Sequence, residues 1–485
     1  MSLISVNNLT FGYDGSLKNI FENVSFNIDT DWKLGLIGRN GKGKTTFLKL
    51  LLGKYEYQGA ISKNVEFDYF PFEVKNKERM AIEIVNEIAP NVEDWEIIRE
   101  LNLLNTDTEV LYRSFNLLSG GEQIKILLIS LFLKGNNFLL IDEPTNHLDI
   151  ETRNNLVNYL EKKKGFILVS HDRNFLDKVV NHIISINNTN IEIQQGNFSS
   201  WKENKNRQDN FEKIQNERLQ KDINRLEIAS KNCAKWSNEA EKTKNKKYNS
   251  ETTIDKGYIG HKADKMMKKS KVTEQRIEKA INEKTNLLKN IEVNDTLKII
   301  PLKSNKNPLI FAHNLQIKYS KETIFNPITF EVNNGDRVAL IGKNGIGKSS
   351  ILKLILGEEL QYNGEFMVAN DLKISYVSQS TEDLKGNLRT FAYDNKINES
   401  IFKAMLVKMG LSQFDFDTNI QDMSEGQKKK VLIAKSISEQ ANIYIWDEPL
   451  NYIDILTREQ IEDAILNYNP TIIFVEHDEK FIEKV

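Results

Sequence analysis

A phosphate-binding loop that occurs twice constrains this chain more than any other feature of its sequence. Residues 38–46 read Gly-Arg-Asn-Gly-Lys-Gly-Lys-Thr-Thr, after an apolar run at 34–37 and before a helical pattern at 47–52. Residues 342–350 repeat the motif as Gly-Lys-Asn-Gly-Ile-Gly-Lys-Ser-Ser in the same context. A strand, a glycine-rich loop and a helix in this order bind phosphate through backbone N–H groups. Because the motif occurs twice, it is not a chance glycine turn.

Each loop carries the residue types that bind a nucleotide and its magnesium ion. Lys44 and Lys348 can reach the β- and γ-phosphates, and the hydroxyls of Thr45 and Ser349 can bind Mg²⁺. The glycines allow the backbone to curl with its N–H groups pointing at phosphate oxygens. The predicted nucleotide-binding residues of the two loops are Gly38, Asn40, Gly41, Gly43, Lys44, Thr45 and Thr46, and Gly342, Asn344, Gly345, Gly347, Lys348, Ser349 and Ser350.

Further motifs follow each loop at nearly constant spacing. A serine–glycine segment begins 75 residues after the first loop lysine and 76 residues after the second. An acid pair follows the same lysines at 98 and 99 residues, and a histidine follows each acid pair at 29 and 30 residues. Such register predicts a tandem duplication. We expect nucleotide-binding domains at 1–198 and 301–485, with an inserted linker at 199–300.

An acid pair ends a buried apolar strand in each half. Residues 138–143 read Phe-Leu-Leu-Ile-Asp-Glu, and residues 443–448 read Ile-Tyr-Ile-Trp-Asp-Glu. A parallel strand delivers both carboxylates at its C-terminal end, where unpaired burial of two acids would be costly without a function. We therefore predict that the aspartates hold Mg²⁺ through water and that the glutamates polarise the attacking water. These residues are Asp142 and Glu143 in the first half, and Asp447 and Glu448 in the second.

Three further kinds of residue recur, although each kind is usually structural when it occurs once. His171 and His477 end the next apolar strand of each half, and their recurrence favours a sensor of the γ-phosphate. Tyr13 and Tyr319 precede the two loops, where a recurring ring favours stacking on the base over a place in the core. The serine–glycine segments open helices, and either one alone would be explained as a simple N-cap. Their candidate nucleotide-binding residues are Ser119, Gly120 and Gly121, and Ser424 and Gly426.

Together these residues resemble the ATP-binding cassette (ABC) family over nearly all of both halves. The resemblance rests on the phosphate loops, the Leu-Ser-Gly-Gly-Glu-Gln segment at 118–123, the acid pairs and the histidines. It implies an α/β fold and a monomer whose two cassettes close head to tail over two ATP molecules. Each loop then faces the serine–glycine segment of the other cassette. In this arrangement Ser424 and Gly426 face Lys44 (the Lys44 site), and Ser119 faces Lys348 (the Lys348 site).

Two departures from the family pattern fall on the Lys44 site. The second half has Gln379 after the strand that precedes its helical region, and the resemblance makes this residue a Mg²⁺ ligand. The first half has Phe72 in that place, and a phenylalanine cannot bind a metal ion. The second serine–glycine segment also has Glu425 where the first has a glycine. We therefore expect the Lys44 site to hydrolyse ATP more slowly than its partner.

The insert has a periodicity of its own. Apolar residues recur every three or four positions along 219–240 and 267–291, which predicts an antiparallel hairpin of two helices. Residues 201–300 carry 24 basic and 16 acidic side chains, although the whole chain has a formal charge of −2. A charge run is usually a solvated face, but a basic tip on an otherwise acidic protein favours an anionic partner such as RNA. The predicted tip includes Lys242, Lys244, Lys246, Lys247 and Tyr248.

Two fused cassettes with a basic helical hairpin and no membrane domain resemble the ABC-F group of translation ATPases. Residues 196–201 look like the entry to that group's linker, and residues 257–271 look like the start of its second linker helix. The first cassette has no inserted arm, and residues 446–454 resemble the antibiotic-protection branch. The resemblance implies ATP and Mg²⁺ as cofactors, and the 23S rRNA of the ribosomal E site and the P-site tRNA as partners. It also implies protection against lincosamides, streptogramin A and pleuromutilins.

Other classes of protein are compatible with parts of this pattern. A housekeeping translation factor would share every motif, and a transporter ATPase would need a membrane partner. A DNA-repair ATPase would normally carry zinc-binding cysteines, whereas this chain has one cysteine, Cys233. A structural coiled-coil protein would not keep two complete acid pairs. The single cysteine, and the lack of a signal-peptide pattern after Met1, predict a cytoplasmic protein. The first half continues into apolar residues at 183–193, and we expect the second half to lack the corresponding strand pair.

Overall fold

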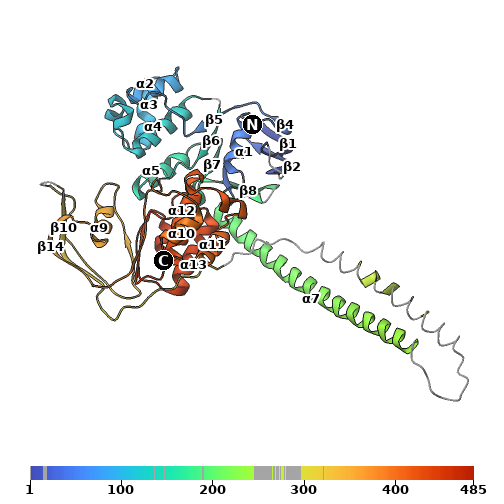
Figure 1. Cartoon of the computed structure of the whole chain (residues 1–485). Helices are drawn as coiled ribbons and strands as arrows, with labels where there is room; N and C mark the ends of the chain where they lie inside the picture. The colour runs from blue at the N-terminus through green and yellow to red at the C-terminus, as the bar shows by residue number, and fades with distance from the viewer. Residues whose placement is uncertain are drawn as a thin grey trace, which may run out of the picture. The chain divides into compact units, whose positions relative to one another are not determined.

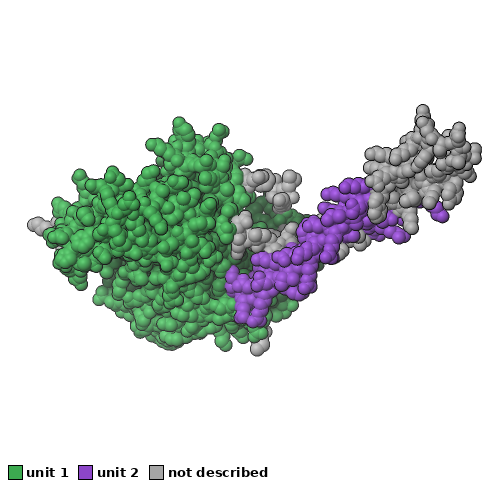
Figure 2. Space-filling model, turned by 90° about the horizontal axis from the view of Figure 1, so that it is seen from below, with its two compact units in different colours: residues 1–201, 294–485 green, residues 202–293 purple. Residues whose placement is uncertain are grey.

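A computed structural model describes residues 2–14, 19–135, 137–146, 148–187, 190–244, 296–319 and 322–485, together with scattered residues between 265 and 279. The chain divides into two compact units, which Figure 2 shows in different colours. One unit comprises Met1–Trp201 and Asn294–Val485 and therefore contains both halves of the tandem repeat. The other unit is Lys202–Val293, within the insert.

The first cassette is built on two sheets. A six-stranded sheet has the order β5-β6-β7-β3-β8-β9, and a three-stranded antiparallel sheet has the order β2-β1-β4. Strands β3, β6 and β7 are almost entirely buried, as parallel strands covered on both faces are. The strands are β1 (Leu3–Phe11), β2 (Phe21–Asp29), β3 (Lys33–Ile37), β4 (Gln58–Ser62), β5 (Glu66–Phe70), β6 (Asn137–Asp142), β7 (Phe166–Val169), β8 (His182–Asn187) and β9 (Asn190–Gln195).

Helices follow the strands of this cassette, and three of them gather apart from the sheets (Figure 1). Helices α2 and α3 both pack against α4, around a cluster of buried apolar side chains in the first cassette. The first helix starts directly at the phosphate loop. The helices are α1 (Lys44–Leu51), α2 (Ala81–Ile88), α3 (Asp94–Leu103), α4 (Gly120–Leu133), α5 (Ile150–Leu160) and α6 (Arg173–Val179), with 3₁₀ segments η1 (Thr108–Tyr112) and η2 (Phe115–Leu117).

The second cassette repeats this plan. Its parallel sheet has the order β13-β17-β16-β15, which matches β3-β7-β6-β5 of the first. The described residues place no strand beyond β13, where the first sheet continues with β8 and β9. The strands are β10 (Ile310–Tyr319), β11 (Glu322–Thr323), β12 (Ile328–Val332), β13 (Arg337–Leu340), β14 (Gln361–Val368), β15 (Ile374–Val377), β16 (Ile443–Asp447) and β17 (Ile472–Val475).

The helices of the second cassette occupy the same places in the repeat as those of the first. Both cassettes therefore confirm the predicted α/β fold with two tandem phosphate-loop domains. The helices are α9 (Lys348–Ile355), α10 (Leu388–Asp394), α11 (Glu399–Lys408), α12 (Glu425–Ser438), α13 (Ile455–Tyr468) and α14 (Glu479–Lys484), with 3₁₀ segments η3 (Gln413–Asp417) and η4 (Ile420–Asp422).

The insert begins with one long helix. Helix α7 (Phe198–Lys244) has 47 residues, which corresponds to a length of about 70 Å (Figure 1). Ile223 is buried, and Leu219, Leu226 and Ala229 are half-buried among exposed neighbours, so the predicted apolar face is present on the part of this helix whose side chains are described. No described helix is both long and apolar enough to cross a membrane.

The predicted tip of the hairpin falls at the edge of the described residues. Lys242 and Lys244 belong to the last turn of α7, whereas Lys246, Lys247 and Tyr248 lie outside the described residues. Of the predicted returning helix, only scattered residues between 265 and 279 are described, and these are helical. The tip and the antiparallel pairing of the two helices therefore stay predictions.

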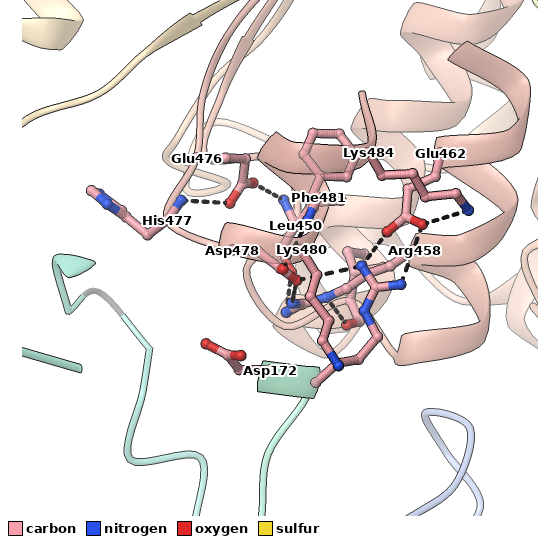
Figure 3. Close-up of polar contacts among 12 residues, drawn as sticks. Asp172, Leu450, Arg458, Glu462, Glu476, His477, Asp478, Lys480, Phe481 and Lys484 are labelled. Carbon is pink, nitrogen blue, oxygen red and sulfur yellow. Dashed lines mark hydrogen bonds and ion pairs between the residues drawn. The ribbon is translucent and has the colours of Figure 1, made fainter. Parts of the chain in front are cut away.

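A buried ion pair joins the two cassettes. Arg173 in α6 donates to both carboxylate oxygens of Glu462 in α13, and the Glu462 side chain is fully buried. Lys484 lies 3.0 Å from the same carboxylate, and Figure 3 labels Glu462 and Lys484 together with Asp478. Burial opposes the charge of Arg173, but Glu462 and Asp478 raise its pKa above the ordinary value. The guanidinium therefore stays charged, and its burial is tolerated because acidic side chains pair with it.

We expect Glu462→Ala to destabilise the protein strongly, because it leaves the Arg173 guanidinium buried without its main partner. The loss in the free energy of unfolding should be about 3–5 kcal/mol, measured by calorimetry on the full chain. The control is the double substitution Arg173→Met and Glu462→Met, which removes both charges at similar volume and should recover most of the loss. A double variant as unstable as Glu462→Ala would show that the unpaired charge is not the cause.

Candidate nucleotide-binding sites

The first phosphate loop depends on glycines in the left-handed region. Gly41 and Gly43 have φ angles of 78° and 92°, which other residues rarely adopt. Lys44 begins α1 and turns its Nζ back over the loop, where it donates to the Gly38 carbonyl at 2.8 Å and to Asn40 Oδ1 at 3.2 Å. Burial lowers the pKa of Lys44. The loop thus holds an ammonium group at the N-terminus of a helix, the place where phosphate binds.

The second loop has the same geometry. Gly345 and Gly347 have φ angles of 79° and 98°. Lys348 begins α9, and its Nζ donates to the carbonyls of Gly342 at 2.7 Å and Lys343 at 3.0 Å. Burial lowers the pKa of this lysine as well. Both predicted loops are therefore formed in full by the fold.

Two of the predicted metal ligands, Asp142 and Asp447, end β6 and β16, and each lies beside the predicted hydroxyl ligand of its own loop. Thr45 donates to Asp142 Oδ2 at 3.1 Å, and the Ser349 hydroxyl bonds to Asp447 in the second cassette. Burial raises the pKa of both aspartates. Asp447 Oδ1 is buried with no hydrogen-bond partner among the described residues. A carboxylate with an open oxygen beside a hydroxyl fits Mg²⁺, which these two pairs of residues would hold.

A tyrosine that the sequence analysis missed contacts the first aspartate. The Tyr69 hydroxyl donates to Asp142 Oδ2 at 2.9 Å, and burial and this carboxylate raise the pKa of Tyr69. Phe72 lies three residues further on with an exposed ring, whereas Gln379 follows β15, the neighbour of β16. One sequence signal could have singled out Tyr69, because a tyrosine, Tyr376, holds the equivalent strand position in the second half. Asp142 Oδ2 therefore accepts hydrogen bonds from both Tyr69 and Thr45.

Each predicted base lies beside its predicted sensor. His171 Nε2 lies 3.3 Å from Glu143 Oε1, and His477 Nε2 lies 3.7 Å from Glu448 Oε1. Burial and the neighbouring Asp142 raise the pKa of Glu143 to about 8. Burial lowers the pKa of His171 well below its ordinary value, so this imidazole is neutral at pH 7. Neither His477 nitrogen makes a hydrogen bond within the described residues, although both are buried. The His477 imidazole can thus turn a nitrogen toward a ligand.

The serine–glycine segments begin helices. Ser119 Oγ accepts a hydrogen bond from the Glu122 N–H at 3.3 Å, and Ser424 Oγ accepts one from the Gln427 N–H at 3.4 Å. Both serines are therefore N-caps, as the simplest interpretation of the sequence predicts. Contact of these segments with a nucleotide stays a prediction.

The structure brings the first loop against the second cassette. Asn40 Nδ2 donates to the Tyr452 carbonyl at 2.6 Å. A Cβ atom on Gly426 would lie 2.7 Å from both of these atoms, so the loop and the second serine–glycine segment touch. This is the head-to-tail pairing expected for the Lys44 site.

The second loop contacts the first cassette at a different place. The Asn344 backbone bonds to Asp149, and Lys343 Nζ lies 2.7 Å from Glu151. For a Cβ atom on Gly121, the three nearest atoms would be side-chain atoms of its own cassette, and none of them would lie closer than 3.5 Å. The Lys348 site is therefore less closely covered by its serine–glycine segment than the Lys44 site.

The predicted stacking residue of the first cassette lies beside its loop. The Tyr13 hydroxyl is 2.8 Å from Thr46 Oγ1, and its ring packs edge-on against Phe11 and Tyr55. The Tyr13 side chain is 44% exposed, so its ring remains accessible to a base. The side chain of Tyr319 lies outside the described residues.

Comparisons with known proteins agree with this geometry. The family model described as "ABC transporter" matches residues 21–146 and 325–451. The ATP-binding protein Uup of Buchnera aphidicola is 30% identical over 510 residues, covering 100% of this chain and 79% of the relative. The ribosome protection protein VmlR of Bacillus subtilis is 28% identical, covering 97% and 84%. ABC transporter F family member 2 of Arabidopsis thaliana is 24% identical, covering 99% and 75%.

A solved structure shares the fold. It is the complex of an archaeal ribosomal stalk protein with the archaeal ribosome recycling factor aABCE1, and it matches with a TM-score of 0.63 at 19% identity. The match covers 99% of this chain and 86% of the other. At this identity the likeness shows the arrangement of two tandem cassettes.

We expect Gly426→Ala and Gly121→Ala to have different effects, although the two glycines hold equivalent positions. The new methyl group at 426 would collide with a backbone carbonyl, at a cost of about 1–3 kcal/mol in the free energy of unfolding. The methyl group at 121 meets ordinary contacts, and alanine favours a helix by up to about 1 kcal/mol. Thermal unfolding of the two variants without nucleotide measures the difference. Equal stabilities would contradict the close approach of the first loop to Gly426.

Proposed function

This chain belongs to the ABC-F family of ATP-binding cassette proteins, and on that premise we propose that it is an ATPase that binds the ribosome. The observation that carries the proposal is the Lys44 site, where a loop of one cassette touches the serine–glycine segment of the other within one chain. Two cassettes that meet in this way can close over Mg²⁺·ATP and reopen after hydrolysis. The ATP state would thereby control the affinity for a partner.

The roles of the site residues follow from their positions. Glu143 and Glu448 are the proposed general bases, and His171 and His477 the proposed sensors of the γ-phosphate, because each pair lies together beside a loop lysine. Asp142 with Thr45, and Asp447 with Ser349 and Gln379, are the proposed Mg²⁺ ligands. Bound Mg²⁺ would neutralise charge on the phosphates, while the loop lysines position them.

The proposed partner is the ribosome. VmlR is named a ribosome protection protein, and the structural relative is a ribosome recycling factor. The insert carries 24 basic and 16 acidic side chains in residues 201–300, which suits a phosphate-rich surface. We propose a cytoplasmic monomer that enters the E site, contacts 23S rRNA and P-site tRNA, and protects the ribosome from lincosamides, streptogramin A and pleuromutilins. A housekeeping translation factor without a drug role is the alternative.

The double substitution Glu143→Gln and Glu448→Gln tests the ATPase and the partner together. Glutamine keeps the size of each side chain but cannot accept the proton, so ATP should bind without turnover. The variant should then co-sediment with ribosomes in the presence of Mg²⁺·ATP, and the native protein should be released as it hydrolyses ATP. Turnover at the native rate in the double variant would overturn the assignment of the bases. Absence from the ribosomal pellet would overturn the partner.

Shortening residues 245–253 to a few glycines separates drug protection from the housekeeping alternative. The shortened protein should keep ATP hydrolysis and ribosome binding, because both cassettes and α7 are unchanged, but it should lose protection. The measurement is translation by isolated ribosomes with and without each antibiotic class. The matched control, Lys242, Lys244, Lys246 and Lys247 to Gln, keeps the length and should weaken ribosome binding, with a flatter salt dependence. Full protection by the shortened protein would contradict an effector role of the tip.

A further inference from the structure

A buried lysine in α12 ties together two segments of the Lys348 site. Lys429 is only 2% exposed, and its Nζ donates to the Ser378 carbonyl at 2.9 Å and to the Glu448 carbonyl at 3.2 Å. Ser378 immediately precedes Gln379, and Glu448 is the proposed base. One side chain therefore connects the segment of the proposed Mg²⁺ ligand with the end of the acid-bearing strand.

The surroundings of this lysine are acidic. Burial lowers the pKa of Lys429, and Glu476, Glu448, Asp447 and Glu425 oppose that shift. Glu476 is also buried, and it accepts hydrogen bonds from the N–H groups of Leu450 at 2.7 Å and His477 at 3.1 Å (Figure 3). The acidic groups make a buried ammonium tolerable at this point.

The same helix is tied to the same segment a second time. Glu425 Oε2 accepts a hydrogen bond from Thr381 Oγ1 at 2.5 Å, and Lys428 Nζ lies 3.0 Å from Glu425 Oε1. Glu425, which replaces the glycine of the first segment, therefore bonds within its own cassette. Both ties join the start of α12 to residues 378–381.

The first cassette has neither tie. By the register of the two serine–glycine segments, Ile124 takes the place of Lys429 and Gly120 the place of Glu425. Ser170 likewise takes the place of Glu476. A cavity of about 320 Å³ lies there instead, and its lining includes Phe72 and Ile124. The two ties are thus present in the second cassette and absent from the equivalent positions of the first.

The start of α12 also touches the other site. Gly426 lies in the first turn of this helix, against Asn40 of the first loop and the Tyr452 carbonyl. Any movement of the segment at closure of the Lys44 site would reach Lys429 within one helical turn.

We propose that Lys429 is a positioning residue that couples the two ATP sites, because it links the segment covering the Lys44 site to Gln379 and Glu448 of the Lys348 site. Closure over ATP at the Lys44 site then sets the position of the base and the Mg²⁺-binding segment at the other. The first cassette has Ile124 at the equivalent place, so this link joins the two sites through the second cassette alone. This inference rests on the proposed ATPase activity.

The test uses Lys429→Met in two backgrounds that each silence one site. In Glu143→Gln, where only the Lys348 site can turn over, Lys429→Met should lower kcat about tenfold and leave KM within about twofold, because binding groups are unchanged. In Glu448→Gln, turnover at the Lys44 site should change by less than about twofold. A loss shared equally by both backgrounds, or absent from both, would overturn the proposal.

Two matched controls separate coupling from damage to the fold. Ile124→Met changes the equivalent position of the first cassette and should leave both backgrounds near their starting rates. Lys429→Ile with Glu476→Ser reproduces the residues of the first cassette at both positions and removes the buried lysine together with its first acidic neighbour. This double variant should unfold near the native temperature but retain the kcat loss. Recovery of kcat with recovered stability would show that Lys429 serves only the fold.

A measurement without turnover keeps this proposal separate from the proposed function. Hydrogen exchange of the peptide 376–387 is followed with and without Mg²⁺·ATP in the Glu143→Gln, Glu448→Gln protein. ATP should protect this peptide at least about fivefold more in that protein than in the same protein with Lys429→Met. Equal protection would overturn the coupling whether or not the native protein hydrolyses ATP. Lack of turnover with unequal protection would overturn the ATPase alone.

Discussion

The close approach of the first phosphate loop to the second cassette is the contact on which the proposed function of this protein depends. Asn40 reaches the Tyr452 carbonyl, and Gly426 lies against both atoms with no space for a side chain. A phosphate loop alone can bind ATP, but binding there would not change the contact between the two cassettes. Because the loop of one cassette touches the helix start of the other, a change at the nucleotide becomes a change between cassettes.

Polar groups are buried where the cassettes meet, and pairing makes this burial possible. Asp454 and Lys430 form an ion pair at 2.6 Å, and burial opposes ionisation of Asp454 while Lys430 holds its pKa below the ordinary value. Arg153 donates to the His477 carbonyl at 2.9 Å, across the two cassettes. The Arg153 bond crosses between the cassettes and needs specific geometry, unlike apolar contacts, and so it helps to fix the register of one cassette against the other.

The two sites share a chemical plan but differ in their surroundings. At the Lys44 site, the Tyr69 hydroxyl donates a hydrogen bond to Asp142, and apolar Phe72 and Ile124 border a cavity. At the Lys348 site, the equivalent region carries Gln379 and buried Lys429. A duplicated chain can change one copy freely, because the other copy retains the chemistry. The difference suits one site that senses ATP and another that hydrolyses it.

The sequence by itself determined the tandem α/β fold, the two loops, the acid pairs and the histidines, because each motif is local and its spacing repeats. The apolar strands that carry Asp142 and Asp447 needed no tertiary information. Only the tertiary structure decided which groups meet across the repeat. Tyr69 and Lys429 looked like ordinary strand and helix residues, and their partners lie 73 and 51 residues away in the chain. Periodicity reports burial but not partners, since a hydrogen bond between distant segments leaves no local pattern.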